Sequence, residues 1–259
     1  MRNRDYAAQI GSAVAVLLLW QLSVDVVGLI SPSVLPAPTA IAITTATLAT
    51  DAGFLAHVGS TLRRTVIASV FAAGFGIVLG LAMGWSDTVR SLLGPIFSAL
   101  YPLPVVALLP LLILIFGRGD GALIFAAAFG GFFLVAWNAM SAAGGIESVY
   151  FDVARDNDAT STYALFREVL LPGSLPVVFT GLRLGLSTSF LIVISVELIA
   201  ANDGLGYFMW VSWNTYQLAE LYASVVVIGA FGIAITYGLE QLQGYLVPWE
   251  EETPRRRLI

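Results

Sequence analysis

The 259-residue sequence contains no cysteine, no lysine and a single histidine, His57. Without cysteine there are no disulfides and no thiol chemistry, and one histidine argues against a histidine-cluster metal site. A phosphate-binding loop of the G-x-x-x-x-G-K-[ST] type requires a lysine, so this chain does not carry one. We therefore expect no catalytic residue, metal or cofactor here, and any ATP hydrolysis that drives the protein must take place in another chain.

Charged residues are scarce as well, at 11% against 58% hydrophobic residues, and the mean hydropathy is +0.87. Soluble domains have about 25% charged residues. The apolar residues fall in runs of about twenty, the length of a bilayer-spanning helix. The sequence predicts a single all-α polytopic domain over residues 1–259, surrounded by lipid and without a nucleic-acid partner. Six transmembrane helices are expected, at about 6–30, 62–85, 92–116, 122–143, 177–201 and 221–247.

The first apolar run follows Arg2 and Arg4, as in a signal peptide, but it is longer than a signal core and no clear cleavage site follows. We expect it to be retained as a transmembrane helix. With the N-terminus inside, three arginines lie outside: Arg63, Arg64 and Arg118. The other nine lie inside: Arg2, Arg4, Arg90, Arg155, Arg167, Arg183, Arg255, Arg256 and Arg257. Because cytoplasmic loops carry the excess of arginine, both ends and the loop at 144–175 are predicted to be cytoplasmic. The Arg255–Arg257 run fits a topology and lipid-headgroup signal.

The formal net charge is −5. An acidic excess without lysine is typical of a salt-loving prokaryote, whereas drift or a GC-rich genome that favours arginine codons would give a similar composition.

Two of the predicted helices carry informative small residues or prolines. The second contains Gly74, Gly76, Gly80 and Gly84, which favour close helix packing in membranes. The third contains Pro95, Pro102, Pro104 and Pro110, each of which removes a backbone donor and kinks or breaks a helix. A break in the membrane needs protein or cavity water to satisfy the freed carbonyls. It therefore indicates either a lining of the translocation pathway or a packing kink.

The loop at 144–175 is too polar to span a membrane and too regular for a plain linker. Apolar residues recur at helical spacing: Val149, Val153, Ala154, Tyr163, Phe166, Val169 and Leu170. Asn157-Asp158 interrupts them as a turn, and Thr160 or Ser161 is suited to cap a second helix. We predict two short amphipathic helices, the second ending at Leu171-Pro172, whose apolar side lies on lipid or on a partner protein.

This loop resembles the "EAA" loop of the permeases of binding-protein-dependent ABC importers. Asp152-Val153-Ala154 stands at the E-A-A position, and Leu171-Pro172 at the later L-P position. Pro176 and Thr180-Gly181-Leu182-Arg183-Leu184 resemble the branch that imports nitrate, sulfonates and taurine. Further matching runs between about residues 32 and 249 are Leu35–Pro38, His57–Arg64, Pro102–Leu111, Phe116-Gly117 and Glu197–Tyr207.

The resemblance implies a type I importer permease with its core at about 60–249. In that family the loop forms a coupling helix that seats in a groove of a separate ATPase subunit, and a solute-binding protein outside the membrane delivers the solute. The resemblance thus implies that ATPase coupling is carried by Asp152, Val153, Ala154, Arg155, Asp158, Ala159, Phe166, Leu171 and Pro172. The permease would be a homodimer, the alternative being a heterodimer with a similar permease. The solute stays open, with a small anion favoured by the family.

Position 158 departs from the family pattern, which has glycine there. Glycine permits a positive φ, whereas aspartate visits that conformation at a cost of about 1 kcal/mol. Either the ATPase carries a compensating basic residue or the coupling is weak.

In the outer half, Glu197 is a carboxylate inside a predicted membrane helix, which is a functional-site hypothesis by default. It either pairs with Arg63, Arg64 or Arg118 or lines the pathway. Gly204 and Gly206, with the aromatic residues that follow, indicate a gate or an interfacial anchor. His57 is expected to be an interfacial polar residue. The predicted pathway or gate thus consists of Glu197, Gly204 and Gly206 together with Pro102, Pro104 and Pro110. The alternative function is a stand-alone secondary transporter or channel, which would predict internal repeats and more buried ionisable groups.

Overall fold

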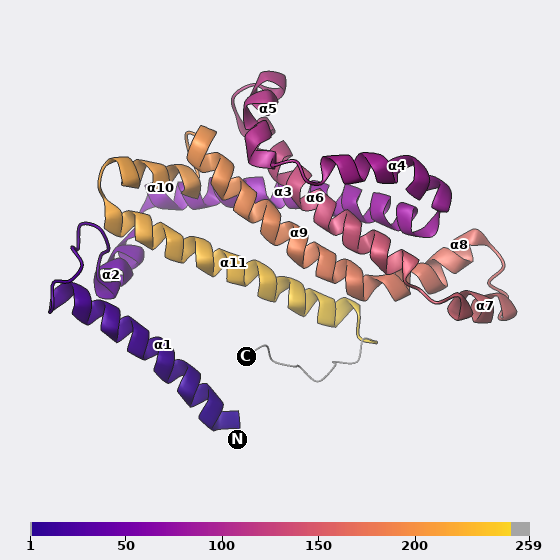
Figure 1. Ribbon diagram of the computed structural model, residues 1–259, viewed down its shortest axis with the longest axis horizontal. Helices are drawn as coiled ribbons and strands as arrows, with labels where there is room; N and C mark the ends of the chain where they lie inside the picture. The colour runs from indigo at the N-terminus through magenta and orange to yellow at the C-terminus, as the bar shows by residue number, and fades with distance from the viewer. Residues whose placement is uncertain (1, 250–259) are drawn as a thin grey trace. The chain divides into compact units, whose positions relative to one another are not determined.

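The computed structural model describes the backbone of residues 2–249 and the side chains of residues 9–249, and every regular element in this part of the chain is helical (Figure 1). The predicted topology signal at Arg255–Arg257 lies outside the described residues. The helices are α1 (Arg2–Asp25), α2 (Pro38–Leu48), α3 (Ala52–Trp85), α4 (Asp87–Leu100), α5 (Leu109–Phe116), α6 (Asp120–Gly144), α7 (Ser148–Asp156), α8 (Thr162–Leu165), α9 (Leu171–Ala200), α10 (Leu205–Asn214) and α11 (Leu218–Leu246). A 3₁₀ turn at Val105–Leu108 precedes α5, and a π turn at Phe166–Leu170 joins α8 to α9.

Four helical stretches among the described residues are long and apolar enough to cross a membrane, or five if the bent pair described below counts as one span. They are Ala52–Trp85, Asp120–Gly144, Thr162–Ala200 and Leu218–Leu246. The all-α prediction is confirmed. The predicted count of six is not reproduced among the described residues, because the bent pair is broken and the described side chains of α1 cover only the shorter apolar stretch Gln9–Asp25.

The predicted third transmembrane helix is broken at its prolines. The chain bends by 83° between Asp87–Leu100 and Val105–Phe116. Pro102 lies in the break, Pro104 caps the 3₁₀ turn and Pro110 lies in the first turn of α5. Pro95, by contrast, lies inside α4 without ending it. The helix breaks here because Pro102 and Pro104, two residues apart, both lack the backbone N–H that a helix needs.

Two further boundaries differ from prediction. The second predicted amphipathic helix does not end at Leu171-Pro172, because α8, the π turn and α9 form one continuous stretch over Thr162–Ala200. A π turn shifts the hydrogen-bond ladder by one residue just before Pro172, and this lets the helix continue past a residue without an N–H. In addition, α3 begins at Ala52, ten residues before the predicted Leu62, and α2 was not predicted at all.

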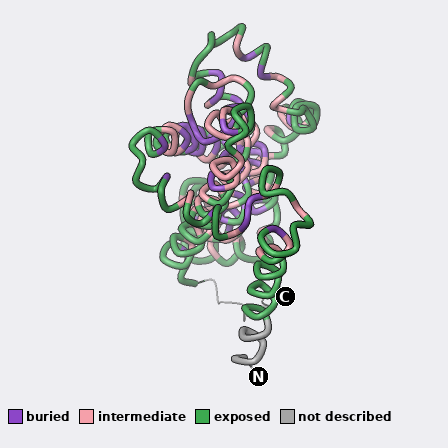
Figure 2. Tube along the Cα trace, turned by 90° about the vertical axis from the view of Figure 1, so that its left-hand side faces the viewer, coloured by how far each residue is buried: buried purple, intermediate pink, exposed green. Residues whose placement is uncertain are grey.

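The chain divides into two compact units: Met1–Thr61 with Glu197–Phe231, and Leu62–Val196 with Gly232–Ile259. In the first unit, the Gln21 side chain binds both the hydroxyl (3.0 Å) and the N–H (3.1 Å) of Thr39, which ties α1 to α2. Residues 9–19 of α1 are all exposed (Figure 2). Exposed apolar side chains on this stretch form a surface that lipid or another protein can cover.

In the second unit, α6 packs closely against α3 and α9. A Cβ atom added to Gly76 would lie 2.8 Å from the Cβ of Val135, and one added to Gly84 would lie 2.5 Å from the Cβ of Ala143. A Cβ on Gly185 of α9 would lie 2.5 Å from a methyl group of Val135. These separations admit only hydrogen at the three glycines, so the predicted close packing of the second helix is confirmed. Gly74 is the exception, with open space around it.

Candidate functional site

The α7–α8 segment (residues 148–165) is built around a tight turn at Asn157–Ala159. The Asn157 side chain donates to the carbonyl of Val153 (2.8 Å), and the Ala159 N–H donates to the carbonyl of Ala154 (3.0 Å). Asp158 adopts the left-handed conformation, with φ of 68°. The Ser161 hydroxyl then accepts a hydrogen bond from the Ala164 N–H (3.1 Å) and caps α8. The predicted turn and cap are therefore both present, with Ser161 as the cap.

Aromatic contacts hold the inner side of this segment. The ring of Trp85, at the end of α3, lies 6.4 Å from that of Phe151 on α7 and 5.6 Å from that of Phe166 in the π turn. Leu165 and Leu170 are buried close by. As a result α7 is attached to two membrane helices, α3 and α9, through one aromatic cluster.

The opposite side of α7 exposes apolar residues. Val149, Tyr150 and Val153 are 51%, 61% and 55% exposed, and Tyr163 of α8 is 70% exposed. Ion pairs do not cover them, since Arg155 turns along the helix to Asp152 (2.8 Å). Exposed apolar side chains at helical spacing on a short helix are typical of a surface that docks into a groove.

A groove of about 730 Å³ runs between α7 and the start of α9. Val153 and Ala154 form one wall, Pro172 lies in the other, and Glu147 and Glu168 supply carboxylates. Of the predicted coupling residues, the groove thus brings together Val153, Ala154 and Pro172, and the turn holds Asp158 and Ala159. Asp152 and Arg155 pair with each other, and Leu171 and Phe166 pack against a core cluster. Ala159 is only 4% exposed and Phe166 is half-buried, so these two act from inside the segment and do not form its surface.

The residues predicted for a pathway or gate fall in different places. Pro102, Pro104 and Pro110 surround the break before α5, in the second unit. Glu197, Gly204 and Gly206 lie in the first unit, at the end of α9 and the start of α10.

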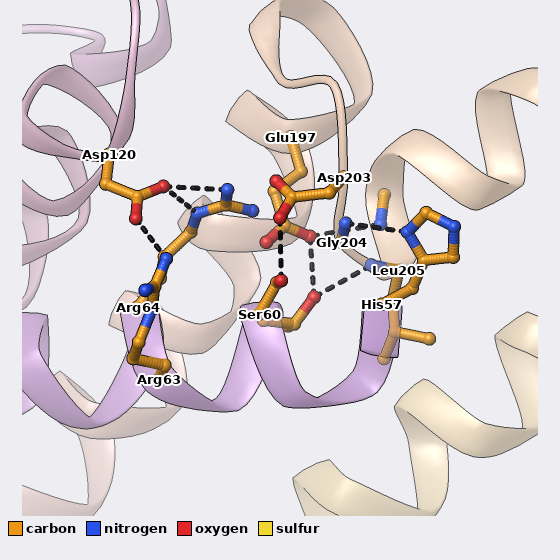
Figure 3. A network of polar contacts seen from close by, with 11 residues as sticks. His57, Ser60, Arg63, Arg64, Asp120, Glu197, Asp203, Gly204 and Leu205 are labelled. Carbon is orange, nitrogen blue, oxygen red and sulfur yellow. Dashed lines mark hydrogen bonds and ion pairs between the residues drawn. The ribbon is translucent and has the colours of Figure 1, made fainter. Parts of the chain in front are cut away.

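Glu197 forms the centre of a buried hydrogen-bond network in the first unit (Figure 3). Its side chain is fully buried, and one carboxylate oxygen accepts from the hydroxyl of Thr61 (2.8 Å) and from the N–H of Gly206 (3.1 Å). The Thr61 hydroxyl in turn accepts from the N–H of Leu205 (2.8 Å). The carboxylate therefore holds the beginning of α10, where free N–H groups favour negative charge.

Gly204 makes this arrangement possible. Its φ of 104° and ψ of 166° lie in a region that is essentially restricted to glycine. A Cβ atom there would lie well inside 3.0 Å of the carboxyl group of Glu197. The Gly204 N–H donates to Nδ1 of His57 (3.0 Å), and the Ser60 hydroxyl donates to Asp203 (2.7 Å). His57 is thus a partner of the backbone, in keeping with its predicted role as a polar residue.

In the second unit, Arg63 and Arg64 both bind Asp120 at the start of α6 (Figure 3). The Arg64 Nε lies 2.7 Å from a carboxylate oxygen of Asp120, and its side chain is only 4% exposed. The sequence prediction did not include Asp120. Its position at the N-terminus of a predicted membrane helix, beside Arg118, was the available signal. No group of three or more histidine, aspartate or glutamate residues that could hold a metal occurs within the described part of the chain.

Comparison with known proteins identifies the family. Residues 72–251 match the family model described as the binding-protein-dependent transport system inner membrane component. The chain is 33% identical to a taurine transport system permease protein of Escherichia coli, over 96% of this chain and 92% of that protein. It is 27% identical to a putative aliphatic sulfonates transport permease protein of Bacillus subtilis, over 90% and 84% of the two chains. It is also 27% identical to a nitrate import permease protein of Synechocystis sp., over 93% and 89%.

The fold is likewise known. A chain of a methionine ABC transporter in an inward-facing conformation superposes with a TM-score of 0.63 at 19% identity, over 71% of this chain and 91% of that chain. The type I importer permease fold expected from the sequence is therefore confirmed. Family and fold agree: the chain belongs to the binding-protein-dependent transport system inner membrane components, the permease subunits of ABC importers.

Proposed function

We propose that this permease couples ATP hydrolysis on a separate ATPase subunit to alternating access for a small solute, and that α7 is the coupling helix. The observation that carries the proposal is the two-sided character of α7. Val149 and Val153 are exposed for docking, whereas Phe151 on the other side contacts Trp85. A displacement of α7 by the ATPase would pass through that cluster to α3 and α9.

Within this segment we assign the docking surface to Asp152, Val153, Ala154 and Arg155. Ala159, Phe166, Leu171 and Pro172 connect it to α9. Asp158 holds the turn in its left-handed conformation, where the family has glycine. Its exposed carboxylate would then face the ATPase, and we propose that the ATPase subunit carries a matching basic residue.

For the pathway we propose that the break at Pro102, Pro104 and Pro110 lines a polar route, because a broken membrane helix frees carbonyls that need solvent or protein partners. Glu197, with Gly204 and Gly206, would set the position of α10 as an outer gate. In this assignment the carboxylate acts through the backbone of α10 and does not bind solute.

For the solute we propose a small oxyanion. Taurine and aliphatic sulfonates carry a sulfonate group, and nitrate is an oxyanion of similar charge, so the relatives share that chemistry. The solute-binding protein would select among them. The oxyanion proposal is supported by these three relatives, each of which the chain matches over at least 84% of the relative's length.

The assembly we propose is a permease homodimer with two ATPases and one binding protein. Both ends of each permease lie in the cytoplasm of a prokaryotic, salt-loving cell. Each permease is one domain, with a core at about 60–249 and the coupling loop at 144–175. The arginine distribution supports the orientation, and the exposed apolar α1 supports a dimer or lipid contact.

The test is solute-stimulated ATPase activity in nanodiscs that hold the permease with its genomically adjacent ATPase and binding protein. Taurine, an alkanesulfonate, nitrate and an uncharged sugar form the solute panel. The matched pair of variants is Val153→Arg on α7 and Tyr245→Arg on α11, both at exposed positions (55% and 82%). We expect Val153→Arg to lower the stimulated rate at least tenfold, since it places an unpaired charge in a docked apolar surface.

Equal stimulated rates for the two variants would contradict a coupling role for α7. Stimulation by the sugar but by no anion would contradict the oxyanion proposal. Transport by the permease alone, without any associated ATPase, would favour the stand-alone transporter.

A further inference from the structure

An apolar groove of about 530 Å³ lies between α3, α5 and α6 within the second unit. All ten residues that line it are apolar or glycine, and six of them are phenylalanines. Phe71 and Phe75 of α3 are 50% and 60% exposed, and Phe125 of α6 is 41% exposed. An apolar hollow of this size excludes ordered water, which needs polar partners, and accepts an apolar ligand.

The groove has the length of one acyl chain in one leaflet. Its α6 wall extends from Gly121 to Phe132, which corresponds to roughly 16 Å at ~1.5 Å per residue. One leaflet of a ~30 Å hydrocarbon core is about 15 Å deep. The α3 and α6 walls belong to helices long enough to span the membrane, so the groove lies along the direction in which lipid chains extend.

Two exposed arginines lie at one end of the groove. Arg118 is exposed and stands between Phe116 and Gly121, which both line the groove. Arg63 is 58% exposed and binds Asp120, the residue next to Gly121. The other end, at Leu79 and Phe132, continues into a second apolar hollow of about 160 Å³. A chain-length apolar groove with arginines at one mouth complements an anionic headgroup attached to an acyl chain.

We infer that this groove is a binding site for an anionic phospholipid, with one acyl chain along α6 and the headgroup at Arg118 and Arg63. The acyl chain would cover the exposed side chains of Phe71 and Phe75 on α3 and pack them against α6. The inference is independent of the coupling role of α7 and of the solute.

The test uses the full-length permease in phosphatidylcholine nanodiscs that contain a small fraction of phosphatidylglycerol with a photoactivatable acyl chain. After illumination, the labelled peptides are mapped by mass spectrometry. We expect labelling concentrated on residues 121–132. Unlabelled phosphatidylglycerol should compete and soluble glycerol phosphate should not, because the headgroup alone lacks the apolar part.

Two variants and one control test the assignment. Ala128→Trp fills the groove and should reduce labelling at least tenfold, whereas Leu191→Trp, at an exposed position of α9 outside the groove, should leave it unchanged. Arg118→Gln alters only an exposed side chain. It should weaken competition by phosphatidylglycerol about fivefold, which corresponds to the ~1 kcal/mol of one basic residue near an anionic surface.

Labelling spread evenly over all lipid-facing helices would overturn the inference. So would competition by glycerol phosphate, which would indicate a simple anion site. A third overturning result would come from the Phe75→Cys variant, which carries the one thiol of an otherwise cysteine-free chain: a disulfide cross-link between two copies. That result would show that a second permease covers the groove.

Discussion

Replacing Gly204 with alanine tests the network around Glu197. Alanine at this position cannot keep φ of 104° with ψ of 166° without strain, and its Cβ would overlap the buried carboxyl group. Either the backbone of the α9–α10 connection or the Glu197 side chain must move. Movement of either one separates the carboxylate from the N–H of Gly206 and the hydroxyl of Thr61.

The expected loss combines two terms. A non-glycine residue in this backbone region costs about 1–3 kcal/mol. Leaving a buried hydrogen-bonding group without its partner costs about 1–3 kcal/mol more. The total is about 2–6 kcal/mol, which for a chain of this size lowers the melting temperature by roughly 4 °C or more.

The assay is thermal unfolding of the purified permease in detergent, followed by tryptophan fluorescence. Gly59→Ala is the matched control, because Gly59 lies on α3 in the same unit and a Cβ there meets nothing within 4 Å. Glu197→Ala loses the same hydrogen bonds and removes the overlap with the added Cβ, so the loss in the double variant with Gly204→Ala should be smaller than the sum of the two single losses. If Gly204→Ala melts at the same temperature as Gly59→Ala, the reasoning about this network is refuted.

Three further substitutions test other parts of the chain by the same unfolding measurement. Asp158→Gly should raise stability by about 1 kcal/mol, because φ of 68° suits glycine better than aspartate; a loss would mean that the carboxylate itself holds the turn. Gly80→Val should cost at least about 2 kcal/mol, since even its Cβ would lie 2.6 Å from the Cβ of Ala139; Gly74→Val, in open space, is the control, and equal losses would contradict close α3–α6 packing. Asp120→Asn should cost about 1–3 kcal/mol because it removes an ionic partner of the buried Arg64. Asp152→Asn, in an exposed pair, should cost under about 1 kcal/mol; an equal cost for both would show that burial of Arg64 is irrelevant.

Much of the fold was predictable because the membrane limits what a chain can do. Long apolar runs must form helices to satisfy their backbone groups, so α6 and α11 lie within a few residues of their predicted ranges. The break at Pro102–Pro104 was predictable for the same local reason. The extension of α3 back to Ala52 was not, since residues 52–61 are more polar and their helical state depends on contacts such as that of Phe54 with Phe208.

The candidate site likewise has features that the sequence predicts and features that depend on distant contacts. The turn at Asp158 and a cap after it depend on neighbours in sequence, and the residue types indicated both, leaving only the choice between Thr160 and Ser161 to the structure. The contact of Trp85 with Phe151 and Phe166 joins residues about 65 to 80 positions apart, so no local pattern could reveal it. The pairing of Arg63 and Arg64 with Asp120 was missed for that reason also.

By itself, the sequence determined the environment, the helical class and the family, because composition and short motifs are properties of residue order. It also determined that the chain has no G-x-x-x-x-G-K-[ST] phosphate-binding loop, since it has no lysine, so any ATP hydrolysis that drives the protein takes place in another chain. Only the tertiary structure decided which face of α7 is tethered and which is exposed. It also decided that Glu197 binds the start of α10 and that six phenylalanines from three helices form one groove. These features arise where distant segments meet, and their distances are set by the packing of whole helices.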